Sequence, residues 1–257
     1  MLNILYRDET LIAIDKPSGL LVHRSLIDKH ETRFAIQLLR DQIGQRVYPL
    51  HRLDKPTSGV LLFALTETAA RAMGAVFEDN AVSKKYLAVV RGYTPEQDRI
   101  DYPLREDLDR MTDARAQQDK PAQPAVTDYT RLATLELQIS DGRHPTSRYS
   151  LLNVTPRTGR KHQIRRHMKH IFHPIIGDTT HGDGRQNAFA RERLGCERLL
   201  LHACALEFDH PFSGERVRIA APLDVHFAEV MRRLGWDADA IGVCPRSSAP
   251  SPDTAAG

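Results

Sequence analysis

Nine residues that end in a glycine and lead directly into an apolar run constrain this chain most. The segment HRLDKPTSG occupies residues 51–59, and the run VLLFAL follows at residues 60–65. This run is rich in strand-forming side chains and too short for a typical helix, so it predicts a buried strand. We therefore expect the carboxylate of Asp54 on an irregular loop held by a rigid strand, which is a common position for a functional side chain.

A structural role for Asp54 is the first alternative. An Asp-Lys-Pro sequence commonly forms a turn in which the carboxylate accepts a backbone hydrogen bond or pairs with a neighbouring cation. Arg52 and Lys55 stand close to Asp54 in this segment. On its own the segment favours the structural role, so a functional role needs support from the rest of the chain.

The order of the predicted elements indicates an α+β fold with a mixed, largely antiparallel central sheet flanked by helices and loops. A hairpin is expected at residues 2–14, and further strands at residues 60–65, 84–92, 125–139, 148–155, 198–208 and 215–220. Helices are expected at residues 32–43, 66–79 and 225–234 and over a basic segment from Thr158, and a long exposed loop at residues 105–125. We expect one domain over residues 1–244 and a disordered tail at residues 245–257.

Composition and cysteine content indicate the cellular compartment in which the protein is expected. A hydrophobic fraction of 41% and a charged fraction of 27% over 257 residues are typical of a soluble globular protein. The chain has no apolar stretch of membrane length, and its start lacks the features of a signal peptide. Cys196, Cys204 and Cys244 form no C-x-x-C and no paired pattern. We therefore expect a cytoplasmic protein without membrane contact or structural disulfides.

Positive charge is concentrated in one segment, although the formal net charge is only +3. Residues 153–177 contain six Lys or Arg and four His but no Asp or Glu. With Thr158 as N-cap, a helix here has a cationic face and an apolar face. The first is formed by Lys161, Arg165 and Lys169, and the second by Ile164, Met168 and Ile171. Such a helix suits salt-dependent binding to phosphates, and a merely solvated basic face is the alternative.

The same segment raises the question of a metal site. Its histidines, at positions 162, 167, 170 and 173, lack nearby carboxylate or thiolate ligands, and six cations would repel a metal ion. We therefore expect no metal. The chain also lacks a phosphate-binding glycine motif and a nucleophile elbow, so ATP-dependent, NAD-dependent and serine-hydrolase functions have no signature here.

Three candidates for chemistry remain: a loop aspartate, a cationic helix and a strand tyrosine. An aspartate can act as a covalent nucleophile at a sugar carbon or an activated ring. A buried partner such as Arg165 would keep Asp54 ionised. Chemistry on a base within folded RNA needs the base turned out of its stack, an aromatic platform and a side chain that fills the gap. Tyr86 and Arg52 are suitable types for the last two.

Taken together, the motifs resemble those of the RluA-type pseudouridine synthases. They are KPSG at 16–19, HRLDKPTSG at 51–59, KKY at 84–86, GRKHQIRRH at 159–167, HPIIGDTTHG at 173–182 and RLLLHA at 198–203. The resemblance implies the pseudouridine synthase fold, a single catalytic domain, and an isomerase that converts uridine to pseudouridine without a cofactor or metal. It is strongest to a tRNA-modifying branch and implies uridine 65 of certain tRNAs as the target, with ribosomal RNA as the alternative.

The resemblance also implies roles for the three catalytic candidates. Asp54 corresponds to the nucleophile, which attacks either the ribose anomeric carbon or C6 of uracil. Tyr86 corresponds to the aromatic residue that stacks on the flipped base and can assist proton transfer. Arg165 corresponds to the arginine that pairs with the aspartate.

Substrate contacts are implied for four further residues. Ile164 lines the base pocket, Arg52 enters the RNA stack, and the basic patch contributes Arg160 and Lys161. Many relatives carry an N-terminal S4-like RNA-binding domain, for which there is no room before the first motif, so the patch is expected to hold the RNA. His181 stands where most relatives have tyrosine, and no role is assigned to it.

Two functions of other classes remain open. A non-catalytic RNA-binding protein could use the same scaffold, although Asp54, Tyr86 and Arg165 together are more than a binder requires. A nucleoside hydrolase or glycosylase could use Asp54 at the same anomeric carbon and would release free uracil. We expect a monomer with no protein partner, because the sequence shows no zipper or swapped arm.

Overall fold

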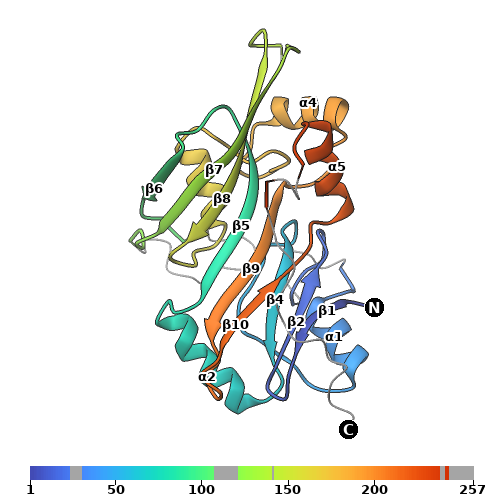
Figure 1. Ribbon diagram of the computed structural model, residues 1–257, viewed down its shortest axis with the longest axis vertical. Coiled ribbons are helices and arrows are strands. Elements are labelled where there is room, and N and C mark those ends of the chain that lie inside the picture. Colours follow the sequence, from blue (N-terminus) through green and yellow to red (C-terminus); the bar gives the residue numbers. More distant parts are fainter. Residues whose placement is uncertain (24–30, 107–120, 141, 238–240, 243–257) are drawn as a thin grey trace.

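The computed structural model describes residues 1–23, 31–106, 121–140, 142–237 and 241–242. These residues form ten strands and five helices, and all ten strands belong to one sheet. The main strand order is β1-β2-β4-β9-β5-β8-β7-β6, with β10 beside β9 and β3 beside β4 (Figure 1). The expected α+β fold with a mixed, largely antiparallel sheet is confirmed.

The bounds of the elements are close to those expected from the sequence. The strands are β1 Asn3–Arg7, β2 Leu11–Lys16, β3 Tyr48–Pro49, β4 Ser58–Ala64, β5 Ser83–Arg91, β6 Gln97–Asp101, β7 Val126–Leu137, β8 Ser147–Pro156, β9 Leu201–Asp209 and β10 Arg216–Ala220. The helices are α1 Ala35–Ile43, α2 Glu67–Glu78, α3 Gln163–His170, α4 Gly184–Leu194 and α5 Val225–Arg233.

Among the described strands, one neighbouring pair is parallel, namely β4 and β9. Their register pairs Ser58 with His202 and Gly59 with Ala203. Gly59 has a φ of +110°, and a Cβ there would overlap the carbonyl oxygen of Ala203. The glycine that ends the HRLDKPTSG motif is therefore required by the close approach of β9.

Three elements were not predicted from the sequence. β3 has two residues, and β6 buries only Ile100, so neither carries an alternating pattern. α4 has a weak apolar periodicity and buries two polar side chains, Gln186 and Asn187, beside Ala190 and Leu194. Tertiary contacts rather than local pattern define these segments.

The basic segment differs from the expectation in where its helix begins. α3 starts at Gln163, and its N-cap is His162 with a φ of 54° rather than Thr158. The side chain of Thr158 donates to Oε1 of Gln163, which also accepts from the backbone N–H of Arg160, so the preceding residues form a turn. Lys161 therefore precedes the helix, and the predicted cationic face of Lys161, Arg165 and Lys169 is wrong.

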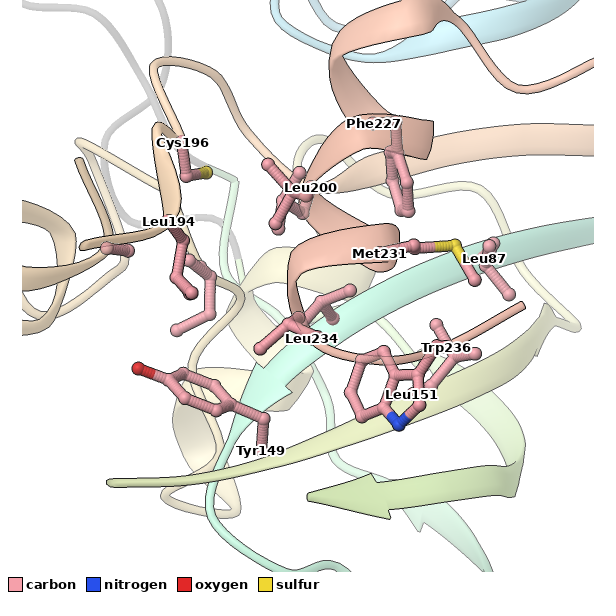
Figure 2. Packing of buried hydrophobic residues seen from close by; sticks show 14 of the residues in the cluster. Leu87, Tyr149, Leu151, Leu194, Cys196, Leu200, Phe227, Met231, Leu234 and Trp236 are labelled. Carbon is pink, nitrogen blue, oxygen red and sulfur yellow. The ribbon is translucent and has the colours of Figure 1, made fainter. Parts of the chain in front are cut away.

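The central sheet is covered on both faces, and β5 shows how the two cores divide. Leu87 and Val89 point to a cluster with α4 and α5, whereas Ala88 and Val90 point to a cluster with α3. Figure 2 shows the first cluster. Its labelled members are Leu87, Tyr149, Leu151, Leu194, Cys196, Leu200, Phe227, Met231, Leu234 and Trp236. Tyr86 packs against the second cluster, on the α3 face of the sheet.

Further sequence expectations concern membrane spans, disulfides, and the segments at residues 105–125 and 245–257. Within the described residues, no helix is both long and apolar enough to cross a membrane. Cys196 is a free, buried thiol, but Cys204 is disulfide-bonded, so the expectation of no disulfide is wrong for Cys204. Most of the expected 105–125 loop and the expected tail at 245–257 lie outside the described residues.

Candidate active site

A groove of about 1240 Å³ lies on the α3 face of the sheet. It is lined by the loop before β4, by β5, by the turn before α3 and by α3 itself. All seven residues that the sequence singled out line this one groove. They are Asp54, Tyr86, Arg165, Arg52, Ile164, Arg160 and Lys161.

The loop that carries Asp54 is fastened to the KPSG turn at residues 16–19. The backbone carbonyl of Asp54 accepts from Thr57 at 3.0 Å, which closes the turn. The backbone N–H of Gly19 donates to the carbonyl of Lys55, and the hydroxyl of Ser18 donates to the carbonyl of Pro56, both at 2.8 Å. The Lys16-Pro17 and Lys55-Pro56 segments therefore brace one another and hold Asp54 at the start of β4.

Lys16 also stabilises the contact between these two segments. Its side chain is fully buried, and its ammonium donates to the backbone carbonyls of Pro17, Leu20 and Lys55. Burial, and secondarily the charge of the nearby Arg198 guanidinium, lowers the pKa of Lys16 to about 7. Lys16 thus connects the first motif to the residue that follows Asp54.

The side chain of Arg165 holds two carboxylates at once. Its Nη1 donates to Oδ2 of Asp54 at 3.0 Å, and its Nε and Nη2 donate to the two oxygens of Asp178 at 2.8 Å each. Burial by itself lowers the pKa of the Arg165 guanidinium, but its hydrogen bonds and the charges of Asp178 and Asp54 outweigh this and raise the pKa. Arg165 is therefore a fixed cation between the two acids.

The two acids bound by Arg165 differ in their access to the groove. The side chain of Asp178 is 1% exposed, whereas that of Asp54 is 26% exposed. Asp178 also accepts the backbone N–H groups of Thr180 and His181, and these bonds and Arg165 lower its pKa although burial raises it. Asp178 is thus committed to holding Arg165, and Asp54 is the acid that can reach a molecule in the groove.

Tyr86 reaches the groove from β5, two strands away from the Asp54 loop. Ala203 on β9 is in register with Gly59 on one side and with Tyr86 on the other, and neighbouring strands lie about 4.8 Å apart. The β5–β9 register shifts between Lys85 and Tyr86, and such bulges re-aim side chains. Burial, and secondarily the charge of Asp54, raises the pKa of the Tyr86 hydroxyl, which favours the protonated phenol.

The four expected substrate-binding residues lie at different depths. Ile164 is 6% exposed and packs with Met168 in the cluster beneath α3, so it forms an apolar part of the groove wall. Arg52, Arg160 and Lys161 are exposed at the groove. Arg160 donates to the backbone carbonyl of Pro124 at 3.1 Å, which anchors its position.

Three groups at the site were not recognised as functional from the sequence. Asp178 and His181 lie within the HPIIGDTTHG motif, and His162 within GRKHQIRRH. Nδ1 of His162 lies 2.9 Å from Nε2 of His181, and Nε2 of His162 lies 3.9 Å from Oδ1 of Asp54. Asp178 is the one acidic residue in HPIIGDTTHG, and this was the sequence signal that could have identified it.

The remaining histidines of the basic segment have separate structural partners. His167 contacts the hydroxyl of Thr127 and the carbonyl of Tyr102, and the ring of His170 stacks on Tyr102. His173 contacts the carbonyl of Arg91. Within the part of the chain that the structure describes, no group of three potential metal-binding side chains converges.

Comparison with known proteins decides the family. The sequence model of the RNA pseudouridylate synthase family matches residues 10–170, which is more than half of the chain. The matched part includes the Asp54 loop, Tyr86 and Arg165. The chain belongs to this family. Pseudouridine synthases are isomerases, so the protein is an enzyme of that class.

Similar proteins extend the match over nearly the whole chain. The chain is 53% identical to a Haemophilus influenzae protein named tRNA pseudouridine synthase C, over 92% of this chain and 99% of that one. It is 52% identical to a Vibrio cholerae protein of the same name, over 92% and 97%. Human RNA pseudouridylate synthase domain containing 1 has a similar structure, with a TM-score of 0.68, 26% identity and coverage of 98% of this chain and 97% of that one.

Proposed function

We propose that the protein converts uridine to pseudouridine in tRNA, at uridine 65, with Asp54 as the nucleophile. The observation that carries this proposal is the bond between Asp54 and Arg165 at the wall of a groove that Tyr86 also lines. The choice of tRNA is supported by the relatives at about half identity that are named for it.

The reaction proposed here rearranges one bond within the substrate. An oxygen of Asp54 bonds to the ribose anomeric carbon, the bond from that carbon to N1 breaks, and uracil leaves with the electron pair. The base turns, C5 bonds to the anomeric carbon as the Asp54 oxygen departs, C5 loses its proton, and N1 gains one. Attack of Asp54 on C6 of uracil is the other route with the same net balance.

The groove residues have distinct tasks in this proposal. Tyr86 provides an aromatic face for the base that has left the stack, and Ile164 covers that base from the α3 side. Arg52 is exposed at the rim, where its guanidinium can occupy the gap left in the RNA. Arg160 and Lys161 face phosphates and supply affinity that does not depend on base sequence.

Replacing Asp54 tests the chemistry. Asp54→Asn and Asp54→Ala should form no pseudouridine in tRNA, as detected by carbodiimide labelling and primer extension, while retaining the affinity for tRNA in a filter-binding assay. Asp41→Asn is the matched control, because Asp41 is an exposed partner of Arg40 outside the groove. Pseudouridine formation by Asp54→Ala would overturn the assignment, and release of free uracil by the unmodified protein would identify a glycosylase instead.

Mapping pseudouridines in RNA from a strain that lacks the gene tests the target. Loss confined to uridine 65 of tRNA supports the proposal, and loss only from ribosomal RNA would overturn it. We further propose that one chain is sufficient, with residues 1–244 as the catalytic domain. Activity that tracks a monomer peak in size-exclusion chromatography is the expected result.

A further inference from the structure

We propose that His181 is a positioning residue of the isomerisation, which fixes the tautomer and ring orientation of His162 so that its Nε2–H faces the carboxylate of Asp54. This inference rests on the proposed role of Asp54 as the nucleophile. The sequence left His181 without a role, and the structure places it one side chain away from that carboxylate.

The contacts around Asp54 form a closed circuit. Arg165 bonds Oδ2 of Asp54 and both oxygens of Asp178, and Oδ1 of Asp178 accepts the backbone N–H of His181 at 2.9 Å. The ring of His181 lies 2.9 Å from the ring of His162, and His162 in turn faces Oδ1 of Asp54. Both oxygens of Asp54 thus face groups that Asp178 holds in place: Arg165 at Oδ2 and, through His181, His162 at Oδ1.

The short distance between the two rings requires that they share one N–H. At 2.9 Å, one of the two facing nitrogens donates and the other accepts, so two arrangements exist for neutral rings. If His181 donates from Nε2, then Nδ1 of His162 accepts and the proton of His162 is on Nε2. If His162 donates from Nδ1, its Nε2 carries a lone pair directed at the carboxylate of Asp54.

The charges around the pair select the first arrangement. A carboxylate oxygen at 3.9 Å attracts an N–H and repels a lone pair. The charged groups in contact with the pair include Asp54, 3.9 Å from His162, and Asp178, which accepts the backbone N–H of His181. Arg165 bonds both of these carboxylates. For two neutral imidazoles, the pair therefore holds one N–H, which His181 donates to Nδ1 of His162.

This arrangement has a consequence for Asp54. Arg165 holds Oδ2 by a direct bond, whereas 3.9 Å is too long for a hydrogen bond to Oδ1. Oδ1 is therefore oriented by the N–H of His162 without being bonded to it, and it can move toward a substrate carbon. The other tautomer of His162, protonated on Nδ1, would direct the lone pair of Nε2 at the carboxylate and repel it from this position.

Nitrogen NMR on the protein labelled in histidine tests the tautomer without reference to activity. At about pH 8, His162, assigned by its loss in His162→Gln, should carry its proton on Nε2 and have a hydrogen-bonded, unprotonated Nδ1. A proton on Nδ1 of His162 would overturn the inference. Because this reading is made on the unmodified protein, it holds even if Asp54 is later shown not to be the nucleophile.

Kinetics test the consequence. His181→Phe keeps the ring volume but removes the donor, so kcat should fall by about tenfold or more while the affinity for tRNA stays unchanged. His181→Gln retains an amide N–H that can donate to Nδ1 of His162, so it should recover most of kcat. His226→Phe is the control, because His226 is exposed on α5. Unchanged kcat in His181→Phe, or equal losses in both variants, would overturn the inference.

Discussion

The guanidinium of Arg165 donates a 3.0 Å hydrogen bond to the carboxylate of Asp54, although the two residues are 111 positions apart in the chain. Arg165 is 4% exposed, so this bond is made by a group that water barely reaches. Two further bonds to the buried Asp178 keep the guanidinium in a fixed plane. Asp178 therefore fixes the orientation of Arg165, and Arg165 in turn fixes the orientation of Asp54.

Removing Arg165 should destabilise the folded protein, because the buried carboxylate of Asp178 then has no cation beside it. Arg165→Met leaves a buried carboxylate without its cation, so the free energy of unfolding should fall by about 3–5 kcal/mol. Adding Asp178→Asn removes that charge while Oδ1 can still accept from the backbone of Thr180 and His181. The double variant should therefore be more stable than Arg165→Met alone in urea unfolding, and a further loss of stability would contradict the pairing.

The geometry of Arg165 matters beyond its charge. Arg165→Lys keeps a cation, but a lysine ammonium cannot reproduce the planar fork that bonds Asp178 twice and Asp54 once. We expect kcat for pseudouridine formation to fall by about 100-fold, with the affinity for tRNA retained because Arg165 is buried. Single-turnover assays and filter binding measure the two quantities, and a variant with unimpaired turnover would show that charge alone suffices.

Close backbone packing at the parallel β4–β9 contact predicts a strong effect of one methyl group. Gly59→Ala places a Cβ onto the carbonyl of Ala203 in a left-handed conformation, so the unfolding free energy should fall by roughly 3 kcal/mol or more. Gly74→Ala is the matched control: Gly74 lies within α2, and a Cβ there meets no atom within 4 Å. That substitution should stabilise the protein by about 0.5–1 kcal/mol, and equal effects would refute the packing argument.

The protein should lose stability as the pH falls below about 6.5. Nε2 of His51 accepts the backbone N–H of Leu62, and burial lowers the pKa of His51 from 6.5 to about 4. Burial likewise lowers the pKa of His202 to about 4. Since the unfolded chain binds these protons at higher pH than the folded chain, the contribution is complete above about pH 6.5 and is lost as the pH approaches 4.

Urea unfolding between pH 4 and pH 7 checks this pH dependence. His51→Gln keeps an acceptor for Leu62 but does not titrate, so its stability should fall less steeply with acid than that of the unmodified protein. Asp15 acts in the opposite direction, because burial and the charge of Asp224 raise its pKa to about 6. His226→Gln should leave the slope unchanged, and the same slope in His51→Gln would contradict the assignment.

Exposed cations at the groove should set the salt dependence of RNA binding. A side chain that contacts a phosphate releases a counterion, so Arg160→Gln should reduce the slope of log Kd against log salt by about one. Lys161→Gln should act similarly. Arg232→Gln is the control, because Arg232 pairs with Glu229 on α5 outside the groove. Equal slopes in all three variants would place the phosphates elsewhere.

The sequence predicted most of the strands, whereas the site residues that it singled out remain predictions that share one groove. The run after Asp54 became β4, and all seven expected residues line one groove. The basic helix was the main error, because helical spacing placed Arg165 on an exposed face with Lys161. The hydrogen bond between Thr158 and Gln163 closes a turn, so the helix begins only at Gln163. Arg165 is buried because it bonds Asp178.

The sequence by itself determined which groups are present and on which kind of element each lies: a carboxylate on a loop before a buried strand, and a tyrosine on a strand. These follow from local pattern, because alternation, turn residues and short apolar runs act between near neighbours. Only the tertiary structure decided which groups meet. The strand order β4-β9-β5 and the burial of Arg165 bring Asp54, Tyr86, Asp178 and the His162–His181 pair together, and such distant contacts have no local periodicity.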